Sequence, residues 1–128
     1  MKVLVVQLTY GNRPLNILVD NDMKAGYPAT FVQVCTEGIA NALNEGIAYM
    51  EENGFDAIAF LANDIIEPQD WLLKKVEALQ SYPAAGIVAS SLDYERISVV
   101  HEMIISNWLI SKAVVEKIGY FNESMFPY

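Results

Sequence analysis

The stretch that decides the fold is Asp56-Ala57-Ile58-Ala59-Phe60-Leu61-Ala62-Asn63-Asp64, in which an apolar run ends directly in an amide and a carboxylate. Ala57 to Leu61 contains no polar residue, and such a run predicts a strand buried on both faces of a parallel sheet. Asn63 and Asp64 then follow the carboxyl end of this strand. In open α/β sheets ligands bind at that edge, because the loops that leave it surround a crevice. Asp64 is therefore the first candidate for a functional residue.

Two further strands are predicted before this one. Val3 to Leu8 is β-branched and apolar apart from Gln7, and Thr30 to Cys35 reads as the second strand. Between them, Asn16 to Asp20 could form a short strand, while the apolar residues of the same segment recur at helical spacing. We predict a helix there, because Pro14 suits a first helical position and a parallel crossover needs about a dozen residues.

Helices and strands continue to alternate along the rest of the chain. An apolar stripe from Ile39 to Met50 predicts a helix after the second strand, and residues 67–70 open another helix after the third. Ala85 to Ala89 is predicted as a fourth strand. The pattern is less regular beyond it and predicts strands over Ile97–Ile105 and Asn107–Ile110 and a short helix over Lys112–Ile118.

Three strand-helix-strand units in succession predict a right-handed, doubly wound α/β sheet that is mainly parallel. The chain has 128 residues, of which 53% are hydrophobic. That length suits one domain with a substantial core and is too short for two ordinary domains. We therefore expect residues 1–128 to form a single domain.

The composition restricts the ligands and the compartment. Sixteen acidic and eight basic residues give a net charge of −8, which makes nucleic acid a poor partner. An anionic ligand would need a divalent cation or helix N-termini to offset this charge. Cys35 is the only cysteine, so the sequence holds no disulfide framework. Without a recognisable signal peptide or long apolar stretch, we expect a cytoplasmic protein with no transmembrane segment.

Several phrases, in this order and spacing, resemble the nucleotide-sugar-dependent glycosyltransferases of family 2, which share the GT-A fold. Thr9-Tyr10-Gly11-Asn12-Arg13-Pro14 resembles the phrase that follows the first strand in that family. Gly38 to Ile47, with Asn44 and Gly46, resembles the family's helix with a repeated Asn-x-Gly pattern.

Two later phrases extend the resemblance over nearly the whole chain. Leu61-Ala62-Asn63-Asp64, followed by Pro68 and Trp71, resembles the family's metal-site strand and the helix after it. Ile110 to Glu123 is similar to the acceptor-side phrase, in which a helix ends in a Gly-x-Phe-Asp-Glu-like turn. Together, collinear on an α/β pattern, these phrases are more specific than any one of them.

The resemblance implies a GT-A three-layer sandwich that transfers a sugar from a UDP- or GDP-type nucleotide sugar to an acceptor hydroxyl, with inversion. It implies that Asp64 binds Mn²⁺ or Mg²⁺, which assists departure of the diphosphate. The acceptor would be a saccharide or glycoconjugate. The residues expected around the nucleotide sugar are Thr9, Tyr10, Asn12, Arg13, Glu37, Asn44 and Asn63.

The sequence departs from the family at several positions. Ala62 stands where the first acid of an Asp-x-Asp metal motif is usual, Gly11 is an extra residue, and Thr36-Glu37 follows the second strand in place of Val-Asp. In the family, an acid a few residues after the acceptor-side phrase acts as general base, and this sequence ends at Tyr128. We therefore expect a domain that lacks the C-terminal acceptor part, with its catalytic base unassigned.

Other interpretations of the same residues stay open at this point. Asp64 could be only a helix cap or a turn former, since Asp favours both places. Asn44 and Gly46 could serve only to let a helix pack closely on the sheet.

Other function classes stay open as well. The chain could be a non-catalytic α/β module that binds nucleotide or protein, either a degenerate transferase or a receiver-like regulator. In the second case residues 19–22 would supply the acidic pocket and Lys112 its lysine. Apolar surface around Trp108, Phe121 and Phe126 could also support a homodimer.

Overall fold

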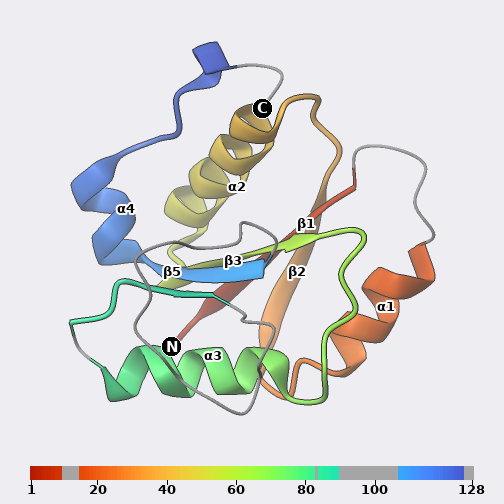
Figure 1. Ribbon diagram of the computed structural model, residues 1–128. Coiled ribbons are helices and arrows are strands. Elements are labelled where there is room, and N and C mark those ends of the chain that lie inside the picture. The colour runs from red at the N-terminus through yellow and green to blue at the C-terminus, as the bar shows by residue number, and fades with distance from the viewer. Residues whose placement is uncertain (10–14, 83, 90–106, 126–128) are drawn as a thin grey trace.

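The computed structural model describes residues 1–9, 15–82, 84–89 and 107–125 (Figure 1). The predicted helices and strands within these residues are all present, and the strand predicted over residues 97–105 lies outside them. The elements are, in chain order, β1 (Val3–Leu8), α1 (Leu15–Met23), β2 (Ala29–Val34), α2 (Ile39–Asn53), β3 (Ala57–Ala62), α3 (Trp71–Ser81), β4 (Ile87–Ala89), β5 (Asn107–Ser111), α4 (Lys112–Ile118) and the short 3-10 helix η1 (Glu123–Met125).

The five strands form one mixed sheet in the order β2-β1-β3-β5-β4. Strand β1 pairs in parallel with β2 and β3, as the sequence predicts. Strand β5 lies between β3 and β4 and is antiparallel to both of them. It begins at the edge where β3 and β4 end, so the chain crosses the sheet in the reverse direction. The α/β class is thus confirmed, and the sheet contains an antiparallel strand that the sequence did not predict.

Helices cover both faces of the sheet and produce three layers, with α2 and α4 on one face and α1 and α3 on the other (Figure 1). Side chains of a strand point alternately to the two faces, and the two apolar clusters follow this alternation. On the α2 face the cluster includes Leu4, Val6, Ile58, Phe60, Leu43 and Ile47. On the α3 face it includes Val3, Val5, Ala59, Leu61, Trp71 and Leu72.

Helix α2 packs tightly on the strands because Gly46 has no side chain. A Cβ atom at Gly46 would lie 2.9 Å from Val6 Cγ2, which is closer than real Cβ atoms approach, and a tight 3.2 Å from Phe60 Cε1. Gly54 ends the helix in the left-handed conformation, at φ 67°, and donates its N–H to the Met50 carbonyl. The structure therefore supports the packing role of Gly46.

None of the helices in the described part of the chain is long and apolar enough to cross a membrane.

Candidate functional site

The strand register brings the ends of β1, β2 and β3 together at one edge of the sheet. Leu8 of β1 pairs with Val34 of β2 and with Ala62 of β3. The N–H of Thr9 donates to the Val34 carbonyl at 2.9 Å, so the alignment continues past the end of β1. The residues that follow the three strands at this carboxyl edge are, in turn, Thr9, Cys35 and Asn63.

Asp64 lies in the turn directly after β3, and its side chain is exposed. Helix α3 begins only at Trp71, and its N-cap residue is Asp70, so Asp64 does not cap that helix. Asn63, the preceding residue, is half-buried. Both residues therefore lie at the edge where α/β sheets bind ligands, and the Asp64 carboxylate is exposed there.

Thr9 and Cys35 border the same edge. Thr9 is half-buried, and its hydroxyl donates to the Val34 carbonyl at 3.3 Å. Cys35 is exposed and was not among the predicted site residues. Pairing the predicted strand ends would have placed Cys35 beside Leu8, at the same edge, whereas the observed partner of Leu8 is Val34.

The loop between β2 and α2 adds a second carboxylate to the edge. Glu37 is exposed, and its backbone carbonyl accepts a 3.2 Å hydrogen bond from the Asn41 side chain. Thr36 donates its hydroxyl to the Glu45 carboxylate. The N-cap position of α2 is held by Gly38, at φ 87° and without a side-chain cap. Glu37 is thus fixed through its backbone while its carboxylate faces solvent.

Asn44 holds the segment after α4 against α2. Its Oδ1 accepts from the Phe121 N–H at 2.7 Å, and its Nδ2 donates to the Phe121 carbonyl at 2.9 Å and to Glu123 Oε1 at 3.1 Å. The side chain is only 8% exposed. The amide therefore places Glu123 beside α2 through contacts within the protein.

The aromatic side chains expected to form an exposed patch are largely packed. Trp108 is 6% exposed and lies 5.4 Å from Phe60, measured between ring centroids. Phe121 meets Trp108 edge-on, at 5.7 Å and 82°. Both tryptophans belong to the core, because Trp71 is 2% exposed on the other face.

Three of the predicted site residues, Tyr10, Asn12 and Arg13, lie outside the described residues. The same holds for the loop after β4 and for Phe126.

A row of polar side chains crosses the α1 and α3 face just below the carboxyl edge. The register aligns Gln7 with Leu61 and Leu61 with Asn107. Gln7, which is 2% exposed, donates to Asp22 Oδ1, and Asn107 donates to Glu67 Oε1. Burial raises the pKa of Asp22 from 3.8 to about 6, although the hydrogen bond from Gln7 partly opposes this shift.

Lys75 of α3 supplies a positive charge to this layer. It is 6% exposed, and its ammonium group lies 5.4 Å from the centre of the Trp71 ring. Burial lowers the pKa of Lys75 from 10.5 to about 8, while the carboxylate of Glu67 acts in the opposite direction. The layer beneath the edge therefore contains a half-buried acid, Asp22, a buried acid, Glu67, and a buried base, Lys75.

Asp22 should make folding stability depend on pH in a predictable direction. Its folded-state pKa is raised, so its contribution to stability is fully present below about pH 4 and is lost as the pH rises to about 6. Because the group is only half-buried, we expect about 1 kcal/mol rather than the full value of the shift. Urea unfolding of Asp22→Asn should show a stability gain, relative to the unchanged protein, that appears between pH 4 and pH 7.

The control for this prediction is Asp20→Asn on the same helix. Asp20 is exposed and pairs with Lys24 at 2.6 Å, so its loss should give no gain over the same interval. If the free energy of unfolding of Asp22→Asn and of the unchanged protein varied with pH in the same way, the raised pKa of Asp22 would be contradicted.

Asp20, Asp22 and Lys112, which a receiver-like pocket would need, do not come together. Asp20 pairs with Lys24 in solvent, whereas Asp22 points inward to Gln7. Lys112 lies at the opposite, amino edge of the sheet, where its N–H donates to the Asp56 carbonyl at 2.8 Å. The acids and the lysine are therefore not positioned to form one site.

The residues at the carboxyl edge that could hold a metal ion are few. No group of three His, Cys, Asp or Glu side chains comes together among the residues that the structure describes. Asp64 and Asn63 are adjacent in the sequence, and carboxylate and amide oxygens are the donor type that Mn²⁺ and Mg²⁺ accept. A cation held by these residues would have to take its other ligands from a bound diphosphate and water.

Comparison with known proteins identifies a shared fold. No family model matches the sequence, and no curated protein matches it. The structure is similar to the crystal structure of A197 from STIV, with a TM-score of 0.63 and 18% sequence identity, over 92% of this chain and 69% of that chain. Identity at this level shows a common α/β fold alone.

Proposed function

We propose that this domain binds a nucleoside diphosphate sugar at the carboxyl edge and transfers the sugar to a hydroxyl of a saccharide or glycoconjugate, with Mn²⁺ or Mg²⁺ and with inversion. One observation carries the proposal. Thr9, Glu37 and Asn63-Asp64 belong to or adjoin phrases that resemble family 2 glycosyltransferases, and the strand ends that bear them are aligned at one edge. The mixed sheet between two helical layers is compatible with a GT-A domain.

Each of these residues has a role that its position allows. Asp64, with Asn63 beside it, would bind the cation and so hold the diphosphate. Glu37 is the acid nearest to the end of β2 and suits a contact with the ribose or the base. Thr9 would border the base at the end of β1. When bound, the cation offsets the negative charge that develops on the leaving diphosphate.

The reaction breaks the bond between the anomeric carbon and the diphosphate oxygen and forms a bond to the acceptor oxygen. The acceptor hydroxyl releases its proton to a base that is not assigned among the described residues. Glu37 and Asp64 make the edge acidic in a chain of net charge −8. Binding of an anionic nucleotide should therefore depend strongly on the divalent cation.

Thermal unfolding tests the proposal. UDP or GDP together with Mn²⁺, at 100 times the dissociation constant, should stabilise the fold by about 2.7 kcal/mol, which corresponds to a rise in Tm of about 5–10 °C. UMP and GMP, which lack the second phosphate, serve as matched controls and should give much smaller shifts. A shift of equal size in EDTA would contradict a metal–diphosphate site.

A non-catalytic nucleotide-binding module is the second candidate. Ala62 favours it, because this position carries the first acid of the metal motif in the family that the sequence resembles. Release of free UDP or GDP from the nucleotide sugars separates the two candidates. Metal-dependent binding without any release, with candidate acceptors present, would favour the second.

A further inference from the structure

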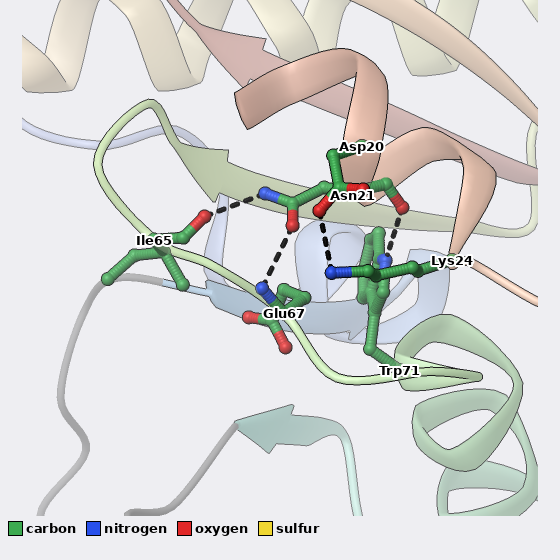
Figure 2. A network of polar contacts seen from close by, with 6 residues as sticks. All are labelled: Asp20, Asn21, Lys24, Ile65, Glu67 and Trp71. Carbon is green, nitrogen blue, oxygen red and sulfur yellow. Dashed lines mark hydrogen bonds and ion pairs between the residues drawn. The ribbon is translucent and has the colours of Figure 1, made fainter. Parts of the chain in front are cut away.

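Asn21 of α1 joins three parts of the chain beneath the carboxyl edge (Figure 2). Its Nδ2 donates to the Ile65 carbonyl at 2.7 Å, and its Oδ1 accepts from the Glu67 N–H at 2.9 Å. Its backbone carbonyl accepts from Trp71 Nε1 at 2.7 Å. Asn21 is 0% exposed; its bonds to Glu67 and Trp71 are buried, and its bond to Ile65 is partly buried.

The loop between β3 and α3 needs side chains that hydrogen-bond to its backbone. Residues 63–70 belong to neither a strand nor a helix, so their backbone groups have no partners within a regular element, and those beside the buried Glu67 must find hydrogen bonds elsewhere. One asparagine amide offers a donor and an acceptor together, and here it serves a carbonyl and an N–H two residues apart. The Glu67 side chain, 1% exposed, provides a second attachment through Asn107 of β5.

This attachment begins one residue after Asp64. The Asp64 side chain is exposed, so packing against the core does not set the direction of its carboxylate. The backbone that follows it is fixed by the Asn21 amide at Ile65 and again at Glu67. The orientation of Asp64 therefore depends on this anchored loop.

We propose that Asn21 is a positioning residue, which holds the loop after β3 so that the Asp64 carboxylate points to the metal and diphosphate. The effect on ligand affinity rests on the proposed function. The effect on the loop itself does not, because it follows from the hydrogen bonds alone. The two can therefore be tested separately.

Asn21→Leu removes both side-chain hydrogen bonds while keeping a side chain of similar size. We expect the ¹⁵N order parameter of the Asp64 amide to fall from about 0.85 to below about 0.6. The affinity for UDP or GDP with Mn²⁺ should fall about tenfold, as is typical when a residue that orients a metal ligand is lost.

Trp71→Phe is the matched control. It removes the third bond of the same cluster, from Trp71 Nε1 to the Asn21 carbonyl, and leaves the contacts to Ile65 and Glu67 in place. It should lower Tm as a lost buried hydrogen bond does. The order parameter at Asp64 should stay unchanged, and the affinity should stay within about twofold. If Asn21 had only a structural role, Asn21→Leu and Trp71→Phe would have similar effects on Tm, on the order parameter at Asp64 and on nucleotide affinity.

Ile66 provides a test that does not disturb the core. Its side chain is 68% exposed, between the two anchored residues. Ile66→Gly gives the backbone more freedom, whereas Ile66→Ala removes the same side chain without that freedom. We expect the glycine variant alone to lower the order parameter at Asp64 and to weaken binding a few-fold. This pair tests whether the backbone between the two Asn21 contacts sets the order of Asp64.

The outcomes are distinct. A looser Asp64 in Asn21→Leu, with unchanged order in Trp71→Phe, supports the positioning role even if no nucleotide binds. Absence of nucleotide binding by the unchanged protein would overturn the proposed function alone. An Asp64 amide as rigid in both test variants as in the unchanged protein would overturn the positioning role.

Discussion

Replacing Trp71 with alanine is expected to lower the free energy of unfolding by about 3–5 kcal/mol, the usual cost of removing a large buried aromatic side chain. Trp71 is 2% exposed and belongs to the apolar cluster between the sheet and α3. Its Nε1 also donates to the Asn21 carbonyl at 2.7 Å. The substitution therefore leaves a cavity and a buried carbonyl without its donor, and both effects destabilise the fold.

Trp71→Phe separates these two contributions. Phenylalanine keeps much of the buried ring but cannot donate to the Asn21 carbonyl, so we expect a loss of about 1–3 kcal/mol. Urea unfolding followed by far-ultraviolet circular dichroism measures both variants without relying on tryptophan fluorescence. A loss below about 1 kcal/mol for Trp71→Ala would show that Trp71 is not part of the core.

Replacing Asp64 with alanine is expected to weaken the binding of UDP or GDP with Mn²⁺ by roughly 30- to 150-fold, if its contact with the cation contributes about 2–3 kcal/mol. Among the residues at the end of β3, Asp64 carries a carboxylate, whereas Ala62 and Asn63 carry no charge. Its exposed position means that the fold itself should keep its stability. Equilibrium dialysis with radiolabelled nucleotide measures the affinity directly.

Asp56→Ala is the matched control for Asp64→Ala. Asp56 precedes the same strand at its amino end, is exposed, and accepts the Lys2 N–H at 2.6 Å. Removing it changes the net charge by the same amount at the opposite edge of the sheet. Equal losses of affinity in the two variants would point to a general charge effect and not to a metal ligand.

The α/β class could be predicted from the sequence, because the apolar patterns of β1 and β3 clearly indicate buried strands. The unbroken run at Ala57 to Leu61 predicts a central strand, and β3 lies between β1 and β5. The direction of β5 could not be predicted in this way, because alternation and burial of side chains are the same in parallel and antiparallel strands. The prediction of a mainly parallel sheet holds for β1, β2, β3 and β4, which run in the same direction, and only the reversed direction of β5 was missed.

The candidate site, too, could be predicted only in part. The position of strand-end residues such as Thr9 and Asp64 could be predicted from the sequence, because the carboxyl ends of parallel strands meet at one edge of the sheet. The partners of the two buried asparagines could not, since Asn44 bonds to Phe121 across 77 residues and Asn21 bonds to Ile65 across 44. Nothing local in the sequence distinguishes such an asparagine from one that binds a ligand.

Calorimetric titration of the unchanged protein with UDP and GDP, each with and without Mn²⁺, tests the nucleotide-sugar site most directly. We predict saturable binding of one nucleoside diphosphate, with one site per chain, that is lost when EDTA replaces the metal. Absence of binding by both nucleotides at millimolar concentration with Mn²⁺ present, or equal affinity without metal, would contradict a metal–diphosphate site at this edge.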